Sequence, residues 1–203
     1  MEGRIIISPS IASCDQMQLM RELEKVEASG CSDVHIDIED GNFVPNISFG
    51  KKTVRALRQS TGLPFSFHLM TRLWRDYTSF CATQGASIVF AHFEALDYPR
   101  EFIFHARSLG LRCGLAFNPK TPVEHAQYLL GDLNGILLLA TEPDDAGEPF
   151  LPHTLERAAW LRGYSKEMDI WVDGAVTYDM LPTLERAGVT HAVMGRAFFQ
   201  GER

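Results

Sequence analysis

The stretch Asp-Val-His-Ile-Asp-Ile-Glu-Asp, residues 33–40, is the part of the chain from which the fold can be worked out. It alternates between apolar and ionisable residues, which is typical of a β-strand. Because successive side chains of a strand point to opposite faces, His35, Asp37 and Glu39 share one face. Burying three ionisable groups together is costly unless they are paired or bind a metal ion. The stretch is therefore either the solvated face of an edge strand or part of a site.

Seven other runs rich in Val, Ile and Phe have the length of strands, and each is followed by a polar or Gly/Pro break and a helical pattern. This alternation is typical of a parallel sheet. Gly30, Gly85, Gly110 and Gly188 support it, because each stands where a helix would end before the next strand. The eight expected strands span residues 4–10, 33–40, 64–70, 87–94, 112–118, 135–141, 168–174 and 191–198.

Eight such strands predict an α/β fold, a TIM-type (β/α)8 barrel formed by a single domain over residues 1–203. Such barrels typically have about 250 residues, so this one would be compact with short loops. Only residues 200–203 are left after the final apolar run, so we expect the eighth helix to be missing or truncated. This would leave apolar surface for another subunit or a chain segment to cover, and we expect a homo-oligomer. A doubly wound open sheet is the alternative, but the dinucleotide fingerprint GxGxxG is absent from the sequence.

The composition narrows the range of partners. The chain has 19 Lys and Arg against 26 Asp and Glu, a formal charge of −7, and no basic run that would bind nucleic acid. No apolar stretch is long enough for a membrane span and no signal-peptide pattern is present, so we expect a cytoplasmic protein without a membrane partner. The four cysteines show no CxxC spacing and are expected to be reduced residues of the core or the barrel wall: Cys14, Cys31, Cys81 and Cys113.

Two other strands carry ionisable residues near their C-terminal ends, which is where the active sites of barrels lie. His68 ends the third strand together with Met70, and Asp173 ends the seventh. A closed barrel has no edge strand, so His35 and Asp37 would meet these side chains at the mouth. Two imidazoles and two carboxylates from three strands predict a site for one divalent metal ion, with Zn, Fe, Mn and Co all compatible.

Other candidates are less clear from their positions. Ser10 ends the first strand, where its hydroxyl would either bond a metal ligand or substrate or cap the turn. His92 and Glu94 end the fourth strand and either support the site or make a structural hydrogen bond. Three further histidines lie in helical or loop contexts and are expected at the surface: His105, His125 and His153.

Along nearly its whole length the sequence resembles the ribulose-phosphate 3-epimerase family. Seven segments carry the resemblance, in order and each at the end of an expected strand: SPSIAS (8–13), HIDIEDGNFVPNISFG (35–50), HLM (68–70), FNPKTP (117–122), EPDDAGEPFLP (142–152), VDGA (172–175) and MGRAFF (194–199). One such segment would be weak evidence, whereas seven with matching spacing are specific.

The resemblance implies epimerisation at C3 of a ketose phosphate. It implies that His35, Asp37, His68 and Asp173 hold the metal, and that the two aspartates are the acid/base pair. Inverting a carbinol carbon beside a ketone removes a proton from one face and returns one to the other, so two proton carriers must flank the substrate. A metal against the substrate oxygens would stabilise the enediolate. The resemblance also implies the substrate contacts Ser10, Met70, Gly147, Gly174, Ala175, Gly195 and Arg196, the last four around the phosphate.

The chain departs from the family pattern around the sugar and the phosphate. Glu39 and Leu139 stand where the family has methionine, VDGA replaces VDGG, and Arg196 replaces serine. The lid keeps Gly147 but adds acidic residues at Asp144, Asp145 and Glu148. Glu39 would be an extra metal ligand, a partner of substrate hydroxyls or a protonated acid, and is counted among the substrate contacts. The sequence thus leaves open which pentulose or hexulose phosphate is the substrate.

Two other functions remain as alternatives. A phosphate-binding-barrel lyase or decarboxylase would need a lysine at the mouth, but the candidates fall in loops or helix starts: Lys51, Lys52, Lys120 and Lys166. A catalytically weak sugar-phosphate sensor is suggested by the acidic lid and by Glu39.

Overall fold

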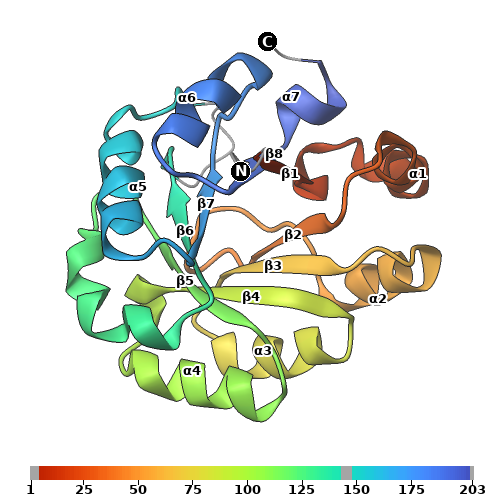
Figure 1. Ribbon diagram of the computed structural model, residues 1–203. Coiled ribbons are helices and arrows are strands. Elements are labelled where there is room, and N and C mark those ends of the chain that lie inside the picture. Colours follow the sequence, from red (N-terminus) through yellow and green to blue (C-terminus); the bar gives the residue numbers. More distant parts are fainter. Residues whose placement is uncertain (1–4, 143–147, 202–203) are drawn as a thin grey trace.

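Eight parallel strands form the centre of the computed structural model, which describes residues 5–142 and 148–201 (Figure 1). Their order in the sheet is β1-β8-β7-β6-β5-β4-β3-β2, and an isolated parallel bridge between Ser10 and His35 joins its two ends. The predicted barrel is confirmed. The strands are β1 Ile6–Pro9, β2 Val34–Glu39, β3 Phe65–Met70, β4 Ala86–His92, β5 Cys113–Phe117, β6 Gly135–Leu139, β7 Asp169–Asp173 and β8 His191–Met194.

Helices surround the barrel and connect successive strands (Figure 1). The α-helices are α1 Leu19–Ser29, α2 Lys51–Ser60, α3 Trp74–Ala82, α4 Pro99–Ser108, α5 His153–Tyr164, α6 Leu181–Arg186 and α7 Arg196–Phe199. The 3₁₀ helices are η1 Ile11–Ser13, η2 Gln16–Gln18, η3 Phe93–Ala95, η4 Val123–Asp132 and η5 Tyr178–Met180. The long 3₁₀ segment η4 takes the place of an α-helix between β5 and β6.

The last strand is shorter than expected, and a helix follows it. The last strand was predicted to continue to residue 198, but β8 ends at Met194 and the following residues form α7. The backbone N–H groups of Phe198 and Phe199 donate to the carbonyl of Gly195 at 3.0 and 3.1 Å, so an apolar run expected to extend is helical. The helix after β8, α7, has four residues. The expected homo-oligomer stays a prediction.

The barrel interior has its own apolar layer beneath the mouth, separate from the core between strands and helices. It contains Ile88, Phe90, Ala116, Leu137, Leu139, Trp171 and Val193. Above it, the β2–β3 register places Asp37 opposite His68 and Glu39 opposite Met70. The ionisable residues of the two strands therefore lie at matching heights.

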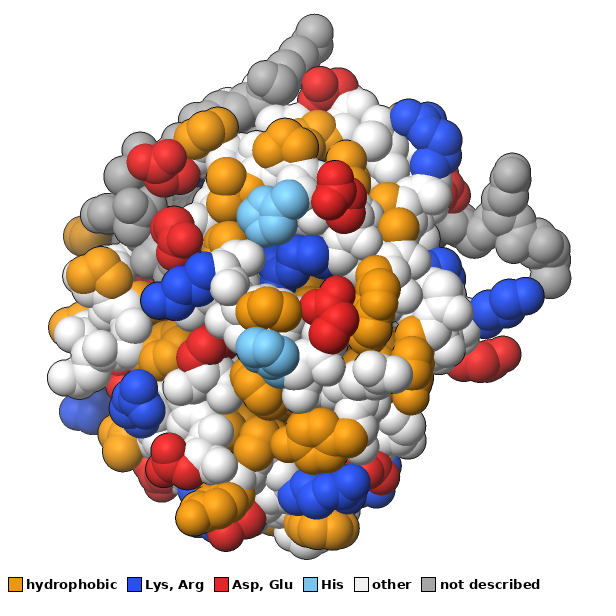
Figure 2. Space-filling model, turned by 90° about the vertical axis from the view of Figure 1, so that its left-hand side faces the viewer, with side chains coloured by type: hydrophobic (Ala, Val, Ile, Leu, Met, Phe, Trp, Pro, Cys, Tyr) orange, Lys and Arg blue, Asp and Glu red, His pale blue; other side chains and the backbone are white. Residues whose placement is uncertain are grey.

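The outer surface carries charges of both signs. On the face shown in Figure 2, acidic, basic and hydrophobic side chains are intermixed. Within residues 5–142 and 148–201, no helix has the length and apolar character needed to cross a membrane. The four cysteines are free thiols, as expected, and three of them are buried.

Candidate active site

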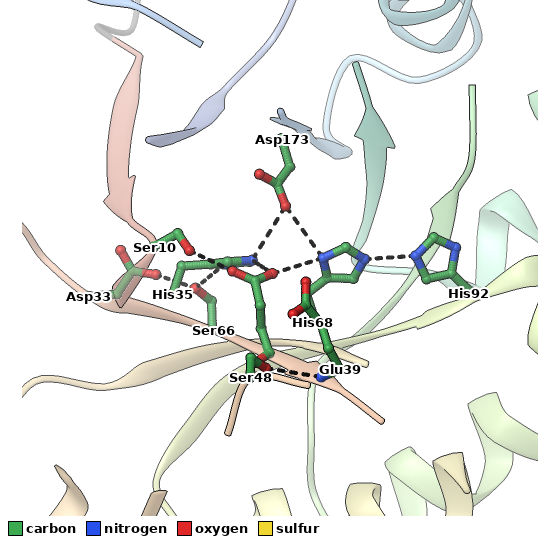
Figure 3. Close-up of polar contacts among 10 residues, drawn as sticks. Ser10, Asp33, His35, Glu39, Ser48, Ser66, His68, His92 and Asp173 are labelled. Atoms are coloured by element: carbon green, nitrogen blue, oxygen red, sulfur yellow. Dashed lines mark hydrogen bonds and ion pairs between the residues drawn. The ribbon is translucent and has the colours of Figure 1, made fainter. Parts of the chain in front are cut away.

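Four side chains from three strands meet at the mouth of the barrel (Figure 3). Each of His35, Asp37, His68 and Asp173 offers one nitrogen or oxygen atom, and these four atoms lie within 4.8 Å of one another. Three of the residues are buried, and the side chain of Asp173 is 17% exposed. β2, β3 and β7 position them because alternate residues of each strand point into the barrel.

The two imidazoles face the two carboxylates. His68 Nδ1 lies 3.0 Å from Asp37 Oδ1 and 3.3 Å from Asp173 Oδ2. His35 Nε2 lies 3.4 Å from Asp37 Oδ1 and 4.0 Å from Asp173 Oδ2. The four atoms thus surround a common centre rather than forming two separate ion pairs.

The donor set fits a divalent metal ion. His35 Nε2 is fully buried, is directed at this centre, and has no hydrogen-bond partner among the described residues. A buried polar atom without a partner is costly and calls for a ligand. Two imidazole nitrogens and two carboxylate oxygens suit Zn, Fe, Mn and Co.

Interactions within the cluster lower the pKa of Asp37 and raise the pKa of His68. Burial raises the pKa of the Asp37 carboxyl, but the neighbouring His35 and His68 outweigh it and hold that pKa well below its usual range. For His68, burial acts to lower the pKa, but hydrogen bonds to Asp173 and Asp37 raise it to about 9. The neighbouring carboxylates thus favour the protonated form of His68.

Ser10 lies directly against the cluster. Its hydroxyl donates to Asp37 Oδ2 at 2.5 Å, and the Ser10–His35 bridge holds it at this height. Ser48 donates to the backbone carbonyl of Asp37 from the loop after β2. Asp37 thus has one oxygen directed at the imidazoles and the other bonded to a serine.

A cavity of about 840 Å³ opens above the cluster. The cluster contributes Asp37 and Asp173 to its wall. Of the expected substrate contacts, Ser10, Glu39, Met70, Gly174, Ala175, Gly195 and Arg196 line it, together with Leu139 and Glu148. Gly147, Asp144 and Asp145 lie outside the described residues.

The turn after β7 has a backbone suited to close approach. Gly174 has φ +106°, and a Cβ there would lie 2.5 Å from Thr141 Oγ1. Ala175 follows with φ 50°, uncommon for a residue with a side chain. Together with Gly195, this turn brings backbone groups to the cavity wall.

Glu39 lines the cavity but is not one of the four clustered residues. Asn46 donates to its Oε2 at 2.9 Å. Burial, and then the charge of Asp37, raise the pKa of Glu39 to about 7. The carboxyl is therefore a polar group at the edge of the site, placed to meet a ligand in the cavity.

His92 and Glu94 lie behind the cluster, where His92 contacts both His68 and Glu94. His92 Nε2 lies 2.8 Å from His68 Nε2, and His92 Nδ1 lies 3.1 Å from Glu94 Oε2. Sequence reasoning missed Asp33 and Ser66, which support His35 in the same way. The three histidines expected at the surface do not line the cavity: His105, His125 and His153. Of these, His105 is partly buried.

Comparison with known proteins identifies the family. Residues 6–199 match the model of the ribulose-phosphate 3-epimerase family. The chain belongs to this family. Ribulose-phosphate 3-epimerase of Treponema pallidum is 34% identical over 99% of this chain and 94% of its own length. The Bacillus subtilis enzyme of the same name is 34% identical over 96% of this chain and 92% of its own length. Members of this family are thus carbohydrate epimerases.

Solved structures with a similar fold include the tryptophan synthase α-subunit of Pyrococcus furiosus. One such structure has a TM-score of 0.69 and 15% identity, covering 98% of this chain and 89% of that chain. At this identity the similarity concerns the barrel alone, and the epimerase family carries the functional argument.

Proposed function

We propose that this chain is a metal-dependent 3-epimerase of a ketose phosphate, either a pentulose or a hexulose phosphate. The observation that carries the proposal is that Asp37 on β2 and Asp173 on β7 face the same pair of imidazoles beneath one cavity. In the sheet order β2 and β7 are separated by β1 and β8, so the carboxylates approach from different sides of the mouth.

This arrangement meets the chemical requirement of epimerisation. Inverting the carbon beside a ketone needs one group that removes its proton and another that returns a proton to the opposite face. Asp37 and Asp173 would exchange these roles with the direction of reaction. Ser10 would hold Asp37 in position by donating to its Oδ2 at 2.5 Å.

Four residues would hold the divalent metal, namely His35, Asp37, His68 and Asp173. When bound, such an ion supplies Lewis-acid stabilisation of negative charge on the substrate oxygens. The buried Nε2 of His35, which makes no hydrogen bond within the described part of the chain, supports this assignment.

The substrate would lie in the cavity with its phosphate at the turns after β7 and β8. Gly174, Ala175 and Gly195 line the cavity there, and exposed backbone N–H groups at turns bind anions. Arg196 lines the same end and would add a charge-assisted contact. Glu39 would accept hydrogen bonds from sugar hydroxyls, while Met70 offers apolar surface to the reacting carbons.

The sensor remains the second candidate, because Glu39 and Glu148 place two acidic side chains on the wall of a site for an anionic ligand. The lyase has less support, since no lysine lines the cavity among the described residues.

Replacing Asp173 by Asn tests the proposal. With saturating zinc, the variant should keep its fold but lose solvent deuterium incorporation at C3 by about 100-fold or more, because one proton carrier is gone. Exposed Asp76, replaced by Asn, is the matched control and should exchange like the wild type. Exchange by Asp173→Asn within about twofold of wild type would rule out the acid/base role.

A further inference from the structure

A hydrogen-bond chain leads from His35 away from the cluster to Asp33 (Figure 3). Ser66, the cross-strand neighbour of His35, has its Oγ 2.9 Å from His35 Nδ1 and donates to Asp33 Oδ2 at 2.6 Å. All three residues are buried. A carboxylate only accepts, so the hydroxyl hydrogen is committed to Asp33 and Ser66 must accept from His35 Nδ1–H. His35 Nε2 then keeps its lone pair directed at the cluster.

A second chain leads from His68 through His92 to Glu94. Glu94 Oε2 lies 3.1 Å from His92 Nδ1, while its Oε1 accepts the backbone N–H of Asn118 at 2.9 Å. A carboxylate only accepts, so His92 donates its Nδ1–H to Glu94, and the other nitrogen of the neutral ring has no hydrogen. His92 Nε2 is then an acceptor, and His68 Nε2 must donate across 2.8 Å. This leaves His68 Nδ1 for the cluster.

Both chains therefore end on a carboxylate outside the cluster and have the same effect on the imidazole inside it. We propose that Asp33 and Glu94 are positioning residues that fix the tautomers of His35 and His68, so that His35 Nε2 and His68 Nδ1 are available to bind the metal. The inference rests on the metal dependence of the proposed function. An imidazole with its hydrogen on the inward nitrogen would direct an N–H at the ion and could not bind it.

Replacing Glu94 by Gln tests the second chain with almost no change in shape. Glu94 accepts from His92 on one oxygen and from Asn118 on the other, and the Thr121 hydroxyl is a further donor to this carboxylate, whereas Gln has a single oxygen. When that oxygen accepts from Asn118, the amide NH₂ faces His92 Nδ1 and forces the His92 hydrogen to Nε2, against His68. We expect a 10- to 100-fold loss of zinc affinity, measured with a competing chelator.

Two variants of Asp33 test the first chain independently, because they should differ in zinc affinity. Only Asp33 Oδ2 has a partner, because Oδ1 has none among the described residues. Asp33→Asn can therefore keep its carbonyl oxygen toward Ser66 and should bind zinc within about twofold of wild type. Asp33→Ala frees the Ser66 hydroxyl to donate to His35 Nδ1 and should bind about tenfold more weakly. Asp33→Asn is also the carboxylate-to-amide control for Glu94→Gln.

The second readout is the position of the ring hydrogens, which a merely structural role would leave unchanged. Long-range ¹H–¹⁵N spectra of protein with ¹⁵N-labelled histidine should place the hydrogen of His92 on Nδ1 in the wild type and on Nε2 in Glu94→Gln. The inference fails if Glu94→Gln moves this hydrogen to Nε2 and still binds zinc like the wild type, or if Asp33→Asn is as weak as Asp33→Ala. Neither readout involves a sugar phosphate, so failure here is distinct from failure of the epimerase assignment.

Discussion

Glu39 gives this site a pH dependence that an apolar residue in its place would not have. Its pKa is raised from 4.5 to about 7, so the folded state holds this proton more tightly than the unfolded state. That stabilisation is complete below pH 4.5 and is lost as the pH rises through 7.

Metal-free Glu39→Gln should therefore equal the wild type in stability near pH 4, where both side chains are neutral. Near pH 8 it should be more stable by roughly 1 to 3 kcal/mol, because it lacks the buried charge beside Asp37. Urea unfolding at the two pH values measures the difference. An equal stability difference at both pH values would contradict the raised pKa of Glu39.

The alternation of a strand was enough to predict that His35, Asp37 and Glu39 share a face. It was not enough to find Asp33 and Ser66. Their role depends on the register between β2 and β3, in which His35 stands opposite Ser66, and a single sequence does not contain that register. Serine and aspartate near strand starts are also ordinary residues without a catalytic pattern.

Strand β5 packs closely against the apolar layer inside the barrel. Gly114 has no side chain because a Cβ there would meet the ring of Phe90 and would lie 2.5 Å from the carbonyl oxygen of Gly135. Phe90 packs in turn against Trp171, with ring centroids 5.2 Å apart.

Gly114→Ala should destabilise the protein by about 1 to 3 kcal/mol, because the rigid strand and the packed ring cannot both move aside. Gly163→Ala in α5 is the control, since a Cβ there meets nothing within 4 Å and alanine favours a helix. Denaturant unfolding compares the two. Equal stability of Gly114→Ala and wild type would show that the interior layer is loosely packed.

Element boundaries were harder to predict than the elements themselves. The eight strands lie where the apolar runs and breaks placed them, most within two residues. The end of the last strand was predicted wrongly because Phe198 and Phe199 continue the apolar run of that strand. Their amide groups instead bond back to Gly195, a local turn that hydrophobic pattern does not report.

The molecule as a whole combines a barrel that brings four side-chain atoms of His and Asp within 4.8 Å of one another with a cavity that opens above them. Family membership and the cluster together favour an enzyme over a sensor. Glu39, Leu139 and Arg196 line the cavity in which the sugar phosphate is proposed to bind. These three residues are therefore the ones to relate to substrate preference.

The most direct measurement is proton exchange at C3 by the wild-type protein. Zinc-loaded protein in D₂O, offered ribulose 5-phosphate and a set of ketohexose phosphates, should introduce deuterium at C3 of at least one of them and form its C3 epimer. A chelator should abolish the exchange, and added zinc should restore it. Calorimetric binding of a ketose phosphate without any exchange at C3 would contradict the account and identify a sensor.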